Sequence, residues 1–186
     1  MLRLFALIAF GFMALAAPAG AQPLPGERQV EASLHSARAA VAPGERFTVV
    51  LRENIREHWH TYWRNPGSSG EPTELTWTAP AGARVGEIQW PAPRAIPFAM
   101  LVNFGYEGEV LFPIEVTAPA NARPGQVLNF TADAYWLVCS DICIPEEARL
   151  TLSVPVAAAG RDDATWGPRV AAAVAALPKR EEGDRK

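Results

Sequence analysis

The sequence predicts an all-β fold, an antiparallel β-sandwich followed by one short helix. From Arg28 onward, segments of β-forming residues, many with a period of two, are broken every 8–14 residues by Pro/Gly turns. Helix-forming segments do not alternate with them, which argues against an α/β sheet. Six tryptophans and seventeen prolines in 186 residues also favour a loop-rich β domain.

Eight strands are expected between the turn signals. They cover 28–37, 46–53, 58–63, 74–79, 84–90, 109–117, 127–138 and 147–156. Turn-forming residues cluster at 42–44, 65–70, 80–82 and 122–125. Short strands at this spacing are typical of an antiparallel sandwich.

Two segments depart from this rhythm. Residues 91–108 form a long connection with three prolines, and loops of this length are often functional. Residues 162–177 carry the one helical pattern, with aspartates at its start and Pro178 at its end. We expect a sandwich domain over 28–158 and a helical linker with a charged tail over 159–186. The helix either leads toward a further segment or packs back on the sandwich, and the pattern favours neither.

The first 21 residues predict an export signal. Arg3 precedes an apolar run over 4–17, and Ala19-Gly20-Ala21 fits a cleavage site. The run is shorter than the ~20 residues that a membrane span needs. We therefore expect a periplasmic protein whose mature chain has no membrane span and begins with a flexible lead-in over 22–27. A net charge of −3 argues against a nucleic-acid partner.

Cys139 and Cys143 are the chemistry candidates. If the strands around them form a hairpin, their three-residue spacing places them opposite each other. Facing Cα atoms in a hairpin lie ~4.5–5.5 Å apart, which suits a disulfide. Both sulfurs are then expected near the surface.

Three roles are open for this pair. A structural disulfide is one, but a five-residue ring contributes only about 2 kcal/mol. A redox-active disulfide is favoured, because a small ring at a hairpin tip is accessible for exchange. A zinc or copper site is the third: His58 and His60 alternate on one strand and would complete a two-His, two-Cys set. His35 is expected to be an ordinary strand residue.

The charge around the cysteines indicates a passive role. Asp141 lies between them, Glu146 and Glu147 follow, and the nearest downstream cation in the sequence is Arg149. Carboxylates disfavour a nearby thiolate. The disulfide is therefore suited to attack by the thiolate of another protein.

Three motifs together resemble the N-terminal periplasmic domain of the DsbD electron transporters and their Scs-type relatives. They are HWHTYWRNPG at 58–67, GYEG at 105–108 and YWLVCSDICIP at 135–145. In order and spacing they cover roughly 30–156.

The resemblance implies an immunoglobulin-like sandwich whose cysteine pair cycles between dithiol and disulfide, with no cofactor. It implies a thioredoxin-like domain or membrane electron transporter as donor and periplasmic disulfide-exchange proteins as acceptors. Cys143 would form the mixed disulfide with the partner. The resemblance places His60 and Tyr62 beside the cysteines.

A cap loop is also implied by the resemblance. It maps onto 98–108, with Phe104 or Tyr106 as the aromatic that shields the disulfide. The alternative is that these two rings fill the edge of the sandwich. The family's cysteine spacer is longer than the one here, and its membrane and thioredoxin-like domains are absent from this sequence. The chain is therefore either a fragment or a stand-alone protein that uses another protein's domains.

Overall fold

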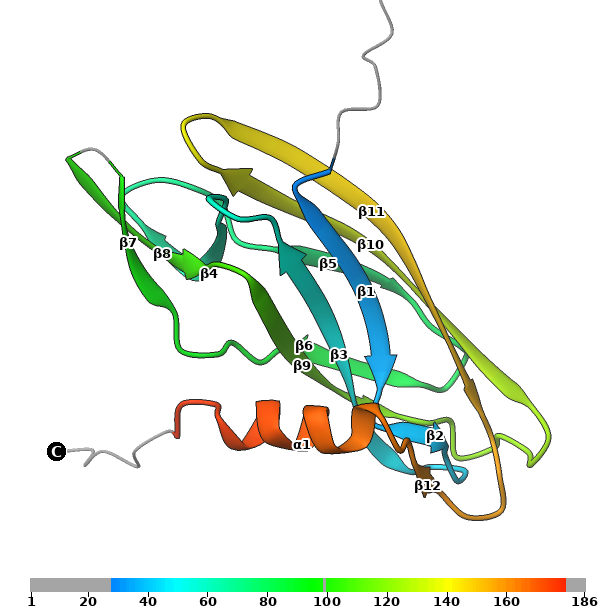
Figure 1. Ribbon diagram of the computed structural model, residues 1–186. Coiled ribbons are helices and arrows are strands. Elements are labelled where there is room, and N and C mark those ends of the chain that lie inside the picture. Colours follow the sequence, from blue (N-terminus) through cyan, green and yellow to red (C-terminus); the bar gives the residue numbers. More distant parts are fainter. Residues whose placement is uncertain (1–27, 99, 180–186) are drawn as a thin grey trace, which may run out of the picture.

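Two antiparallel sheets face each other in the computed structural model, which describes residues 28–98 and 100–179 (Figure 1). The first sheet has the order β1-β3-β9-β6 and the second the order β11-β10-β5. Their strands are β1 (Val30–Ser36), β3 (Arg46–Ile55), β5 (Glu74–Thr78), β6 (Arg84–Ile88), β9 (Glu109–Thr117), β10 (Val127–Cys139) and β11 (Cys143–Pro155). The predicted all-β, immunoglobulin-like antiparallel sandwich is confirmed.

The hydrophobic core lies between these sheets. Every second residue of β10 from Leu128 to Val138 is buried, as the period of two requires. Phe47 of β3 meets Phe130 of β10 edge to face, with ring centroids 6.4 Å apart. Trp136 lies fully inside the core, whereas the partly buried tryptophans Trp59, Trp63, Trp77 and Trp90 pack against it.

A third sheet, of order β4-β8-β7, lies at one end of the sandwich (Figure 1). It consists of β4 (Thr61–Gly67), β7 (Arg94–Phe98) and β8 (Leu101–Tyr106). The predicted long connection over 91–108 is therefore wrong in its main part, because β7 and β8 pair as an antiparallel hairpin. Pro97 is tolerated there because β7 is an edge strand, where a residue without an N–H group need not break the ladder.

The predicted strand 109–117 coincides with β9, and the other strand boundaries differ from the prediction by a few residues. His58 has a φ of +70°, so β4 begins only at Thr61. β4 continues through part of the expected break at 65–70, with a register shift between Tyr62 and Gly67. Two short strands, β2 (Arg38–Ala40) and β12 (Arg161–Asp162), pair with each other and were not expected.

The helix α1 (Trp166–Ala175) packs back onto the outer face of β1, β3 and β9. Its Val170 is buried, and Asp163 Oδ1 accepts hydrogen bonds from the N–H groups of Thr165 and Trp166. The ring of Trp166 stacks on His35 with centroids 3.4 Å apart. His35 therefore contributes to helix docking, which its place in a strand did not suggest.

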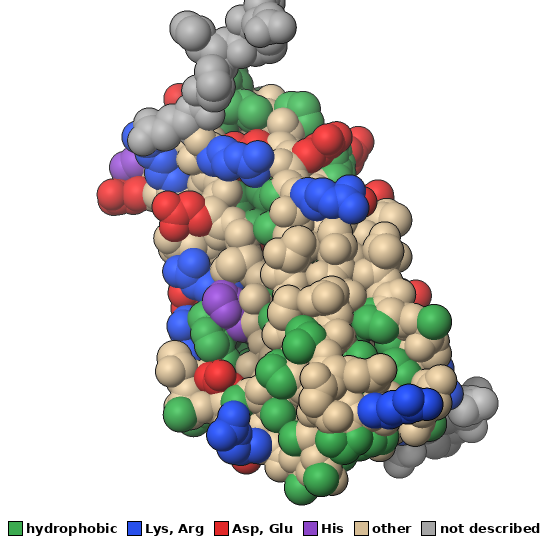
Figure 2. Space-filling view, turned by 90° about the vertical axis from the view of Figure 1, so that its right-hand side faces the viewer, with side chains coloured by type: hydrophobic (Ala, Val, Ile, Leu, Met, Phe, Trp, Pro, Cys, Tyr) green, Lys and Arg blue, Asp and Glu red, His purple; other side chains and the backbone are tan. Residues whose placement is uncertain are grey.

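The surface carries charges of both signs. Figure 2 shows lysine or arginine side chains interspersed with acidic ones, without a large area of a single sign on that face. Arg149 and Asp133 form one ion pair of this kind, 3.1 Å apart.

Some predictions concern other parts of the chain. The expected export signal at 1–21, the lead-in at 22–27 and the charged residues 180–186 lie outside the described residues. Within the described part, no helix is long and apolar enough to cross a membrane.

Candidate functional site

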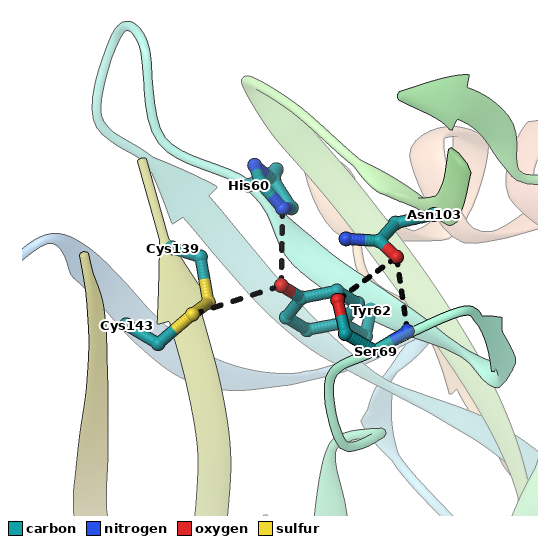
Figure 3. The surroundings of a disulfide bond; sticks show 6 residues. All are labelled: His60, Tyr62, Ser69, Asn103, Cys139 and Cys143. Atoms are coloured by element: carbon teal, nitrogen blue, oxygen red, sulfur yellow. Dashed lines mark hydrogen bonds between the residues drawn. A yellow bond between two sulfur atoms is a disulfide. The ribbon is translucent and has the colours of Figure 1, made fainter. Parts of the chain in front are cut away.

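The β10–β11 hairpin places the two cysteines opposite each other. The strands pair without a register shift from Val127↔Pro155 to Cys139↔Cys143. At the tip, the N–H group of Ser140 donates to the carbonyl of Ile142. The Cα atoms of Cys139 and Cys143 lie 4.1 Å apart and their sulfurs form a disulfide (Figure 3). The predicted pairing across the hairpin end is thus present.

The two sulfurs have different environments. Cys139 is fully buried, whereas Cys143 is exposed. The expectation that both lie near the surface is wrong for Cys139, because its backbone pairs with the residue that precedes β4. The N–H group of His60 donates to the Cys139 carbonyl at 2.9 Å, and that of Cys139 donates to the His60 carbonyl at 3.0 Å. Cys143 is therefore the more accessible cysteine of the pair.

Tyr62 and His60 form a polar chain beside the disulfide. The Tyr62 hydroxyl lies 4.0 Å from Cys143 Sγ and 3.2 Å from His60 Nε2 (Figure 3). Burial raises the pKa of the Tyr62 phenol. Burial also lowers the pKa of His60, with a smaller opposite effect from the negative charge of Glu107. Near neutral pH a protonated phenol and a neutral imidazole therefore lie next to the sulfur.

Residues that the motifs did not indicate hold the Tyr62 ring in place. Gly70 has a φ of +98° and lies so close that a Cβ there would be 2.2 Å from Tyr62 Cε1. Asn103 of β8 accepts hydrogen bonds from the N–H group and the hydroxyl of Ser69, at 3.2 and 3.1 Å (Figure 3). The turn at 68–70 is thereby fastened beside the ring. Its Gly/Ser composition was the available signal, but composition alone indicates only a turn.

The structure brings neither candidate cap aromatic to the disulfide. Tyr106 pairs with Thr61 across the strands, lies in the core 5.1 Å from the Phe112 ring, and donates to the Pro91 carbonyl. Phe104 points to the same face of β8 as Tyr106 and packs edge to face on Trp63. Tyr62 lies on the opposite face, because it pairs with Gly105. The aromatic side chain beside the sulfurs is thus Tyr62 of β4.

The remaining sequence candidates lie at the rim of the site or away from it. Asp141 is exposed in the hairpin turn. The His58 side chain is 85% exposed and lies 3.8 Å from Glu57, so it does not join His60 on one face. Among residues 28–98 and 100–179, no group of three or more His, Cys, Asp or Glu side chains is arranged to hold a metal ion.

The fold and the site define a class of protein. An immunoglobulin-like sandwich with a half-exposed disulfide at a hairpin tip has the accessible cysteine pair that a thiol–disulfide interchange domain needs. The family model for the N-terminal domain of the thiol:disulfide interchange protein DsbD matches residues 29–155, and the chain belongs to this family.

One of the similar solved structures supports the fold. The N-terminal periplasmic domain of ScsB from Proteus mirabilis is similar at 23% identity and a TM-score of 0.62, covering 84% of this chain and 57% of that one. The reduced N-terminal domain of DsbD from Neisseria meningitidis matches at 15% identity and a TM-score of 0.36, covering 72% and 91%. No curated protein sequence matches the chain.

Proposed function

We propose that this domain relays electron pairs between periplasmic proteins through the Cys139–Cys143 disulfide. The observation that carries the proposal is the unequal exposure of the two cysteines. Cys143 is open to a partner, while Cys139 is buried behind it. A disulfide whose only role is stability would gain little from a five-residue ring, about 2 kcal/mol.

The exchange proceeds in two steps. A partner thiolate attacks Cys143 Sγ, the bond to Cys139 breaks, and its electron pair leaves on Cys139, which takes up a proton. The partner's second thiolate then attacks the partner sulfur of the mixed disulfide. Cys143 leaves as a thiolate and takes up a proton in turn. The partner is oxidised to a disulfide, and the domain gains two electrons and two protons.

Tyr62 is suited to assist the second step. Its hydroxyl is the polar group beside Cys143 Sγ, and a phenol donates to a departing thiolate. With its Nε2 protonated, His60 donates to Tyr62 and orients the phenol toward the sulfur. A hydrogen bond to the charged form favours it and lowers the pKa of the thiol.

The donor that fits this role is a thioredoxin-like domain, and the acceptors are periplasmic disulfide-exchange proteins. The β7–β8 and β10–β11 hairpins turn at the same end of the molecule (Figure 1). Exposed apolar side chains of β8 and of these two turns support a protein partner. They are Met100, Leu101, Val102, Phe104 and Ile142. Side chains of this kind are common at the centre of protein interfaces.

A periplasmic location is part of the proposal and is supported by the family and by the expected export signal. The similar ScsB domain is described as periplasmic. This chain spans 57% of the length of that domain, so the partners, and any transporter with which it acts, are part of the proposal.

The test is the reduction potential of the disulfide. Protein equilibrated in glutathione buffers of defined ratio is quenched by alkylation, and the reduced fraction is measured by mass. We expect a potential above about −300 mV, the range of exchange-active disulfides. A value below that range would contradict the relay and favour a structural disulfide.

A further inference from the structure

Glu53 places a carboxyl group inside the core next to the site. It lies on the inward face of β3 between Leu51 and Ile55 and is fully buried. Its Oε2 accepts a hydrogen bond from the Thr61 hydroxyl and its Oε1 from the Thr73 hydroxyl, each at 2.8 Å. Burying a carboxyl group is costly unless such bonds compensate.

The two threonines belong to the two segments that enclose Tyr62. Thr61 directly precedes Tyr62 at the start of β4. Thr73 follows the turn in which Gly70 lies against the Tyr62 ring. The Glu53 carboxyl thus connects the sandwich to both segments at once. Because Tyr62 lies 4.0 Å from Cys143 Sγ, this connection extends to the reactive sulfur.

We propose that Glu53 is a positioning residue for the cysteine pair: by holding Thr61 and Thr73 together, its carboxylate fixes the Tyr62 hydroxyl beside Cys143. The inference rests on the proposed exchange function and deepens it. A carboxylate accepts from both hydroxyls, whereas a protonated carboxyl must donate one of its own bonds. The neutral form therefore holds the two segments less firmly.

The surroundings of Glu53 set the pH at which this change occurs. Burial, with a smaller contribution from the negative charge of Glu146, raises its pKa to about 7 against the lowering effect of the two threonine bonds. Tyr106 of β8 also interacts with Glu53 electrostatically, and burial raises the pKa of its phenol. The residues opposite Glu53 in its own sheet are Ala32 and Val110, which do not titrate. The Glu53–Thr61–Thr73 clamp, in which the carboxylate accepts from both hydroxyls, should therefore tighten as pH rises through 7.

The experiment compares wild type with Glu53→Gln as reduced, full-length proteins. Iodoacetamide alkylation of Cys143 is followed by mass spectrometry from pH 5.5 to 8.5, which needs no partner or exchange activity. We expect equal rates at pH 5.5 and about three- to tenfold slower alkylation of Glu53→Gln at pH 8.5, the size of one lost hydrogen bond. The midpoint of the change should lie near pH 7.

The sign of the effect separates positioning from simple charge. Removing a nearby negative charge would favour the thiolate and speed alkylation of Glu53→Gln. Faster alkylation, or a ratio that does not change with pH, would overturn the proposal. Glu45→Gln is the control, because the Glu45 carboxylate also accepts hydrogen bonds, from Arg38 and the Ala42 N–H group, and pairs with the Arg38 charge. Glu45 lies just before the start of β3 and contacts neither Thr61 nor Thr73 through these bonds. The ratio of its Cys143 alkylation rate to that of wild type should stay at one across the pH range.

A second pair of variants covers the case in which Glu53→Gln fails to fold. Thr73→Val removes one hydroxyl from the clamp, and Thr73→Ser keeps it. At pH 8.5 we expect Cys143 to be alkylated more slowly in Thr73→Val and at the wild-type rate in Thr73→Ser. Equal rates for the two variants would overturn the proposal. If wild type shows a low reduction potential while these differences persist, the relay fails but the positioning role stands.

Discussion

The Tyr62 hydroxyl lies 4.0 Å from Sγ of Cys143, the exposed cysteine of the disulfide. Tyr62→Phe removes this donor and keeps the ring. We expect the pKa of the Cys143 thiol to rise and its alkylation at pH 7 to slow by about three- to tenfold, as for the loss of one hydrogen bond. Tyr135→Phe, which loses an exposed bond to Glu71, is the control. Equal rates for wild type and Tyr62→Phe would remove the phenol from the mechanism.

The cysteines should differ when mutated one at a time. Cys139→Ser leaves the exposed Cys143 free to form a mixed disulfide with glutathione, whereas Cys143→Ser leaves a buried thiol that reacts slowly. Both variants should fold, because the small ring contributes only about 2 kcal/mol. Mass spectrometry after mixing with oxidised glutathione gives the rates, and urea unfolding gives the stability. A Cys139→Ser chain that does not fold would support a structural disulfide.

Tyr106 and Phe104 should affect stability rather than access to the disulfide. Tyr106→Ala removes a core ring and should cost about 3–5 kcal/mol of unfolding free energy. Phe104→Ala should cost less, since Phe104 is 38% exposed. In both folded variants, glutathione should reduce the disulfide at the wild-type rate. A several-fold faster reduction of Phe104→Ala would instead support the cap that the family resemblance suggests.

Glu53 should make the protein less stable as pH rises. Its pKa is about 7 in the folded state, above the ordinary value of 4.5, so between these values the native state binds more protons than the unfolded state. The free energy of unfolding then falls with pH across this window, by at most about 1.4 kcal/mol per pH unit. Urea unfolding from pH 4 to 8 measures the difference between wild type and Glu53→Gln. A difference that does not vary with pH would mean that Glu53 does not titrate there.

Gly70 should tolerate no side chain. An alanine there would combine a φ of +98° with a Cβ 2.2 Å from Tyr62 Cε1. Gly108→Ala is the matched control, because Gly108 also has a positive φ, +68°, but its added Cβ meets nothing within 4 Å. Left-handed strain costs about 1–2 kcal/mol in both variants. Gly70→Ala should lose more than this and should also slow Cys143 alkylation. Equal losses in the two variants would show that the Tyr62 ring moves away freely.

The parts of the site that are local in sequence could be predicted. The three-residue spacing and the period of two in 127–138 determine the hairpin register. The Cys139–Cys143 pairing therefore depends only on residues that are close together in the sequence. The cap could not be predicted in this way. The face on which Phe104 lies depends on β8 pairing with β4, and prolines in the preceding segment concealed the hairpin.

The sequence also carries a signal for Glu53. Alternation within 46–53 puts this acidic residue on the same face as Phe47, Val49 and Leu51, where an apolar residue is expected. Its partners could not be inferred, because Thr61 and Thr73 reach it only through tertiary packing. A charged residue that breaks the apolar face of a strand is therefore worth testing for a role.

The burial of Cys139 behind Cys143 has a kinetic consequence. If Cys143 is the cysteine at which both partners react, donor and acceptor must bind to the same surface around it. They cannot be bound there together. Each turnover then alternates between them, with the first oxidised partner leaving before the second arrives. Such a relay follows ping-pong kinetics, with parallel lines in double-reciprocal plots. An excess of either partner should inhibit turnover, because that partner then binds at Cys143 during the half-reaction that belongs to the other partner.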